Sequence, residues 1–118
     1  METFMTTIWH NPKCTKSRAA LALLSEKNQE IEVIKYLETR PTRAQIEILL
    51  EKLGIGARAL MRTKEELYKE LGLAKIEDEN LLIDALAQHP KLIERPILIR
   101  GNQAIIGRPI EKVIDFLT

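Results

Sequence analysis

The fold is decided by residues 6–24, which read TTIWHNPKCTKSRAALALL. A short β-favouring run, Thr6–Trp9, is followed by Asn11-Pro12, a pair typical of a strand end and a turn. Apolar residues then recur at three- and four-residue spacing, at Ala19, Ala20, Leu23 and Leu24, as on one face of a helix. The segment therefore predicts a strand, a short loop and a helix that begins at Thr15, with Cys14 at the junction.

The next segment extends this unit to strand–helix–strand. Asn28 is the expected end of the helix, and the β-branched run Ile31–Tyr36 predicts a second strand. Two strands joined through a helix are most simply parallel, with a right-handed crossover.

Three helices are expected in the middle of the chain, each with a capping signal at its start and a breaker at its end. They begin at Thr42, Thr63 and Asp78 and stop at Gly54, Gly72 and Pro90. The first carries an apolar face of Ile46, Leu49, Leu50 and Leu53, and the third a face of Leu81, Leu82, Ala85 and Leu86. The chain is therefore helical over about residues 42–90.

The last third returns to strands. Two apolar runs, Pro96–Ile99 and Ala104–Ile106, flank a Gly-Asn pair that is typical of a two-residue hairpin. Pro109 suits the first position of a final helix, whose apolar face is Ile110, Val113, Ile114 and Leu117. The order βαβ…ββα predicts an α/β, thioredoxin-like mixed sheet flanked by helices, in a single domain of residues 1–118 with a helical insertion at about 42–90.

Composition excludes several classes of function. A chain of 118 residues has room for one domain, and its 18 Lys and Arg balance 17 Asp and Glu to a net charge of +1. The net charge is therefore too small to produce an overall positive field that attracts nucleic acid or a membrane, and neither is an expected partner. The apolar stretches are too short to span a bilayer, no targeting segment is recognisable, and a cytoplasmic protein is expected. One cysteine and two histidines exclude an internal disulfide and predict no metal site.

The single cysteine has the surroundings of a reactive thiol. Cys14 precedes a helix, whose N-terminal N–H groups and dipole stabilise a thiolate. The cations Lys13, Lys16 and Arg18 lie close to it in sequence, with His10 four residues before and the hydroxyls of Thr15 and Ser17 after. The alternative is a small buried hydrophobe, the commoner role of a lone cysteine. The charged loop favours a nucleophile.

The segment Cys14-Thr-Lys-Ser17 resembles Cys-x-x-Cys with its second cysteine replaced. The sequence holds no other thiol that could resolve a disulfide at Cys14. If Cys14 performs redox chemistry, an external thiol must therefore complete the cycle.

Arginines stand at several element boundaries: Arg58, Arg62, Arg95 and Arg108. In the predicted sheet, Arg95 precedes the third strand and Arg108 the last helix, both near the end that carries Cys14. Guanidinium groups that converge on a thiolate would form an oxyanion pocket, whereas the alternative is that these arginines are solvated at the surface. Arg95-Pro96 is also a candidate cis peptide.

Several motifs occur in an order and spacing that together are specific. They are His10-Asn-Pro-Lys-Cys-Thr-Lys-Ser-Arg18, Tyr36-Leu-Glu38, Arg58-Ala-Leu-Met-Arg62, Leu71-Gly-Leu73, Glu94-Arg-Pro-Ile97 and Gly107-Arg-Pro109. From about Ile8 to Leu117 the chain resembles the glutathione/glutaredoxin-coupled bacterial arsenate reductase family, in its short form that lacks a C-terminal extension.

The resemblance implies a cytoplasmic, monomeric enzyme of arsenical resistance that reduces arsenate, or a similar oxyanion, through a covalent adduct on Cys14. It implies that His10 helps to lower the thiol pKa and that Arg62, Arg95 and Arg108 bind the substrate. The supporting loop residues are Asn11, Thr15, Ser17 and Arg18. Glutathione is the implied co-substrate and glutaredoxin the partner that resolves the mixed disulfide, with no tightly bound cofactor.

The same fold includes a regulator that binds RNA polymerase, usually through a Cys-x-x-Cys switch. Ser17 in place of the second cysteine argues against such a redox switch but not against protein binding. An interaction module without arsenate reductase activity is therefore the alternative function.

Overall fold

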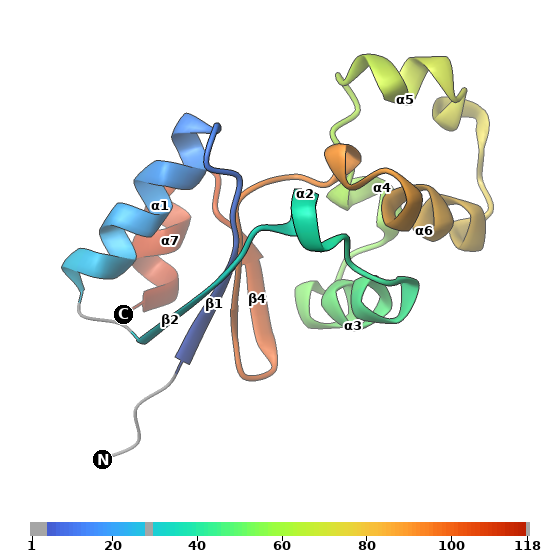
Figure 1. The fold of residues 1–118 in the computed structure, drawn as a ribbon. Coiled ribbons are helices and arrows are strands. Elements are labelled where there is room, and N and C mark those ends of the chain that lie inside the picture. Colours follow the sequence, from blue (N-terminus) through green and yellow to red (C-terminus); the bar gives the residue numbers. More distant parts are fainter. Residues whose placement is uncertain (1–4, 28–29, 118) are drawn as a thin grey trace. The chain divides into compact units, whose positions relative to one another are not determined.

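The computed structural model describes residues 5–27 and 30–117 (Figure 1). Contacts divide the chain into two compact units, one of Met1–Thr39 with Arg95–Thr118 and one of Arg40–Glu94. The second unit contains the whole expected insertion, and the expectation of a single domain stays a prediction. Within the described ranges, no helix is long and apolar enough to cross a membrane.

The first unit is built on a four-stranded mixed sheet in the order β2-β1-β3-β4. Its strands are β1 (Met5–Trp9), β2 (Glu30–Ile34), β3 (Ile97–Arg100) and β4 (Gln103–Ile106). β1 runs parallel to β2 through helix α1 (Thr15–Glu26), whereas β3 is antiparallel to both β1 and β4. The predicted parallel strand–helix–strand unit and the C-terminal hairpin are confirmed.

The register brings three chain segments to one end of the sheet. Trp9, the last residue of β1, is opposite Ile97, the first residue of β3, and Ile97 is opposite Ile106, the last residue of β4. The segments that leave β1, enter β3 and leave β4 therefore meet at this end. They carry the Cys14 loop, Arg95 and Arg108, as predicted from the sequence.

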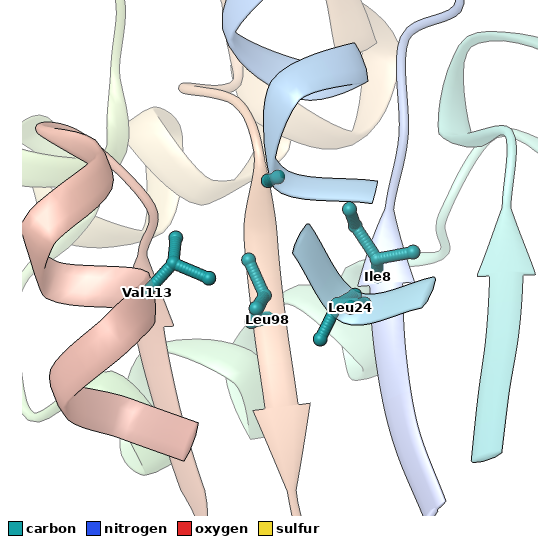
Figure 2. Packing of buried hydrophobic residues seen from close by; sticks show 5 residues of the cluster. Ile8, Leu24, Leu98 and Val113 are labelled. Carbon is teal, nitrogen blue, oxygen red and sulfur yellow. The ribbon is translucent and has the colours of Figure 1, made fainter. Parts of the chain in front are cut away.

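Helices α1 and α7 (Ile110–Leu117) lie side by side against the sheet (Figure 1). Between them and the strands, the side chains of Ile8, Leu24, Leu98 and Val113 form a fully buried cluster (Figure 2). Burial of an aliphatic side chain is worth about 1.5–3 kcal/mol, so this cluster anchors α1 and with it the loop at its start. The expected face of α7 is wrong at Ile114, which is 39% exposed, while Phe116 packs against the cluster.

The second strand is shorter than the sequence predicted. It ends at Ile34, whose carbonyl accepts a hydrogen bond from the N–H of His10 at 2.8 Å. Tyr36 is therefore not a strand residue but begins the short helix α2 (Tyr36–Thr39), and its ring stacks on Trp9 with centroids 6.3 Å apart. At the end of α1 the cap is Lys27, and the expected stop, Asn28, lies outside the described residues.

The second unit is helical, as predicted. It consists of α3 (Arg43–Leu53), α4 (Ala57–Leu60), α5 (Glu66–Glu70), η1 (Leu73–Lys75), α6 (Glu79–Gln88) and η2 (Pro90–Leu92). Thr42 and Gln45 form the predicted capping box of α3, and Gly54 ends the helix in the left-handed conformation, with φ of +68°. Asp78 caps α6 by accepting the N–H of Asn80, also as predicted.

Two details of this unit were predicted wrongly. The capping box expected at Thr63 does not form, because α5 begins only after Glu65, whose side chain pairs with Arg62 and Lys91. On α6, Leu81 is 52% exposed and Ile83 takes its place in the buried face.

Candidate functional site

Cys14 is the N-cap residue of α1, with an extended backbone at φ −96° and ψ 122°. Its N–H donates to the carbonyl of Asn11 at 3.0 Å, so a tight turn delivers the side chain to the helix start. Only 7% of the residue is exposed. The thiol therefore lies where the first free N–H groups of a helix are available to an anion.

The surroundings of Cys14 favour its thiolate form. Burial by itself raises the pKa of this thiol, but the N–H groups of Ser17 and Lys16 and the guanidinium of Arg95 outweigh it, so that the net pKa is lowered. A lowered pKa increases the fraction of nucleophilic thiolate at neutral pH.

Arg95 interacts with the thiol of Cys14 and also has hydrogen-bond donors that no other described group uses. Its guanidinium hydrogen-bonds the Cys14 side chain. Its Nε and Nη1 are buried and have no hydrogen-bond partner within the part of the chain that is described. Buried donors without partners cost free energy, which an oxyanion at this place would recover through charge-assisted hydrogen bonds.

His10 and Ser17 form a buried pair beneath the loop. His10 Nδ1 and Ser17 Oγ are 2.6 Å apart, and the same hydroxyl oxygen accepts the N–H of Asn11 at 3.0 Å. Burial, with the charges of Lys35 and Arg18, lowers the pKa of His10, which favours the neutral imidazole. In this arrangement the histidine supports the loop through a hydrogen bond and not through positive charge.

The other predicted loop residues brace the turn. Asn11 accepts the N–H of Lys13 through Oδ1 at 3.0 Å. The Arg18 guanidinium donates to the carbonyl of Pro12 at 2.9 Å and to the Thr15 hydroxyl at 3.3 Å. These hydrogen bonds hold the turn that precedes Cys14 and join it to the first residue of α1.

Arg108 leaves the sheet at the same end as Arg95. The N–H of Gly107 donates to the carbonyl of Pro96 at 2.8 Å, which joins the two arginine segments. A Cβ on Gly107 would lie 3.0 Å from both Pro96 Cγ and Val113 Cγ2, so a larger residue here would require these side chains to shift. Both Arg95-Pro96, as anticipated, and Arg108-Pro109 are cis peptides.

Arg62 belongs to the second unit, and its convergence on Cys14 stays a prediction. There its Nη1 is 3.1 Å from Glu65 Oε2, and the other oxygen of this carboxylate is 3.2 Å from Lys91 Nζ. The sequence analysis did not single out Glu65, although its three-residue spacing from Arg62 is typical of a helical ion pair. Arg58 is structural, because it binds the Tyr68 hydroxyl and the carbonyls of Leu73 and Ile76.

The described residues contain no group of three or more His, Cys, Asp or Glu side chains that could hold a metal ion. The chemistry available at the sheet end is that of a thiolate and guanidinium groups. A thiolate beside the buried Arg95 donors, which have no partner among the described residues, is suited to attack the central atom of a bound oxyanion.

The sheet topology and the thiol at the start of α1 define a thioredoxin-like thiol protein. Residues 9–116 match the ArsC family, so the chain belongs to this family. An arsenate reductase of Neisseria meningitidis serogroup A is 48% identical over 108 residues, which cover 90% of this chain and 92% of that protein. The uncharacterized protein YfgD of Escherichia coli is 50% identical over 112 residues, which cover 93% and 94%. The solved structure of an arsenate reductase from Vibrio cholerae matches with a TM-score of 0.92 at 48% identity, over 97% of this chain and 98% of that chain.

Proposed function

We propose that this protein reduces arsenate to arsenite through a covalent intermediate on Cys14. The observation that carries the proposal is the contact of the Cys14 thiol with the Arg95 guanidinium, whose Nε and Nη1 are buried without a partner among the described residues. Arg95 can stabilise the thiolate and hold an oxyanion at the same time. The names of relatives such as the Neisseria enzyme support arsenate as that oxyanion.

The first chemical step is a substitution at arsenic. The Cys14 thiolate attacks As(V), an S–As bond forms, and one oxygen leaves as water after protonation. The charge that builds on the remaining oxygens is met by guanidinium groups, which in the proposed site are those of Arg95, Arg108 and Arg62. His10 and Ser17 hold the loop so that the sulfur faces the bound anion.

The second step needs a thiol that the chain lacks, because Cys14 is its only cysteine. Glutathione attacks Cys14 Sγ, an S–S bond forms, and the S–As bond breaks with both electrons passing to arsenic. Arsenite leaves as As(III), and glutaredoxin then takes the glutathione moiety by thiol–disulfide exchange. Because external thiols supply both electrons, the cycle uses no tightly bound cofactor, and a monomer in the reducing cytoplasm would suffice.

The test is arsenate-dependent NADPH consumption in the presence of glutathione, glutaredoxin and glutathione reductase. Wild type is expected to turn over, Cys14→Ser to fall to background, and Lys27→Ala, at the far end of α1, to match wild type. Equal background turnover of wild type and Cys14→Ser would refute the assignment. Capture of RNA polymerase by both proteins would then favour an interaction module.

A further inference from the structure

Arg62 is held in the second unit through its backbone as well as its side chain. Its N–H donates to the carbonyl of Leu92 at 2.7 Å, beside an antiparallel bridge between Met61 and Ile93. Both bridge residues are buried, so the backbone next to the arginine is anchored among the buried residues of this unit. In the sequence, the segment that pairs with Arg62 leads directly into Arg95, which stands two residues after Ile93.

The side chain of Arg62 is held at one corner of its guanidinium. Nη1 lies 3.1 Å from Glu65 Oε2 and donates to the carbonyl of Lys91 at 3.4 Å. Nε and Nη2 have no partner in the ranges 5–27 and 30–117. These two nitrogens form one complete edge of the planar fork, which can bind an oxyanion through two parallel hydrogen bonds. The contacts therefore hold the guanidinium and leave a binding edge unused.

A carboxylate beside Arg62 would by itself cancel the charge that attracts an oxyanion. Lys91 compensates for this loss, because its Nζ lies 3.2 Å from Glu65 Oε1. Two cations and one carboxylate leave a formal charge of +1, the charge of a single arginine. The Glu65 side chain is only 15% exposed between its two partners. The arrangement thus restrains the guanidinium without neutralising it.

Helix capping does not explain the carboxylate at this position. Glu65 is the N-cap residue of α5, but its side chain makes no capping hydrogen bond. Within the part of the chain that the structure describes, its only side-chain partners are Arg62 and Lys91.

We propose, building on the proposed function, that Glu65 is a positioning residue for Arg62: it fixes the guanidinium before the oxyanion arrives, while Lys91 offsets its charge. An arginine side chain has many rotamers, and a ligand that must immobilise them binds more weakly. Because Glu65 already restrains this side chain in the free protein, less of that entropy is lost when the oxyanion binds. Glu65 acts through Arg62 and touches neither the substrate nor the thiol.

The substitution Glu65→Gln separates positioning from a simple effect of charge. It removes both ion pairs with little change in side-chain size, and it raises the local formal charge from +1 to +2. If the carboxylate only weakened the positive field, the variant would bind arsenate more tightly, whereas loss of positioning should weaken binding. The matched control is Glu66→Gln, which removes the same charge from the adjacent exposed residue; Glu66 forms no ion pair with any described residue.

Binding is measured without turnover, as the arsenate concentration that half-protects Cys14 from alkylation by iodoacetamide. Glu65→Gln should raise this concentration about tenfold, as for the loss of one charge-assisted hydrogen bond, and Glu66→Gln should leave it unchanged. The alkylation rate without arsenate should equal that of wild type. In the coupled assay, the KM for arsenate should rise while the KM for glutathione stays the same. A merely structural role would lower kcat through loss of folded protein and would leave both KM values unchanged.

Combination with Arg62→Ala tests whether Glu65 acts through this arginine. Arsenate should already bind weakly to Arg62→Ala, and the addition of Glu65→Gln should cause no further loss. Equal losses from Glu65→Gln in both backgrounds, or unchanged or tighter binding in Glu65→Gln alone, would overturn the inference and leave the proposed function intact. By contrast, a wild-type Cys14 that arsenate does not protect, together with absence of turnover, would refute the proposed function and the inference with it.

Discussion

At the scale of single residues, the reactivity of Cys14 depends on a balance between opposing effects. Burial opposes the thiolate, whereas the N–H groups at the start of α1 and the Arg95 guanidinium favour it. Because Arg95 contributes both charge and a hydrogen bond, it is the one side chain whose removal should shift this balance.

Arg95→Gln should therefore raise the pKa of Cys14 toward its ordinary value, because it removes the charge beside the thiolate. Arg95→Lys keeps a charge but loses the planar fork, so it should restore the thiol pKa in part while leaving oxyanion binding impaired. The rate of iodoacetamide alkylation as a function of pH measures this pKa directly. Superimposable titrations of wild type and Arg95→Gln would contradict the assigned role.

The sequence predicted the position of Cys14 well but not the role of its neighbours. The residue types that predict a helix start and a positive charge near Cys14 all lie within residues 10–18, so the sequence alone reveals them. The hydrogen bond between His10 and Ser17 depends on how the turn folds back over the first turn of α1, which residue types alone do not specify. The resemblance implies that His10 helps to lower the thiol pKa, and this role stays a prediction, whereas the lowered pKa of His10 itself favours a neutral imidazole beside Ser17.

At the scale of secondary-structure elements, the second unit contains a real capping box and a false one. Thr42 and Gln45 bond reciprocally at the start of α3. Thr63 and Glu66 have the same spacing, but the ion pairs of Glu65 with Arg62 and Lys91 hold the chain in a turn until α5 begins at Glu66. A spacing rule cannot foresee this, because Lys91 lies far along the chain.

The two threonines form a matched pair for mutation. Thr42→Ala should lower the free energy of unfolding by about 1 kcal/mol, because it leaves the N–H of Gln45 without its cap. Thr63→Ala should change it by less than about 0.5 kcal/mol, since this side chain is exposed and caps no helix. Urea unfolding of the two variants measures both values, and equal losses would show that the capping assignments are wrong.

At the scale of the molecule, the sheet register explains why sequence reasoning could place Arg95 and Arg108 together. Strand order and direction fix which chain ends meet, and the pairing Trp9–Ile97–Ile106 brings the two arginines to the end that carries Cys14. Arg62 lies in the other compact unit, outside the four-stranded sheet whose register places the other two arginines. Its role therefore stays a prediction from the resemblance alone.

The lowered thiol pKa also has a consequence for the stability of the whole molecule. Between the folded-state pKa of Cys14 and its higher value in the unfolded chain, the unfolded state binds more protons, so the free energy of unfolding rises with pH. The lowered pKa of His10 also makes the free energy of unfolding rise with pH, but only at pH values below 6.5. The substitution Cys14→Ser removes only the contribution of the thiol, which acts at higher pH. The difference in unfolding free energy between wild type and this variant should thus grow as the pH rises from the lowered folded-state pKa of Cys14 toward the ordinary pKa of a thiol, as measured by urea unfolding under a non-thiol reductant. Parallel curves would mean that the fold does not stabilise the thiolate, and the activation of Cys14 would have to come from the bound substrate.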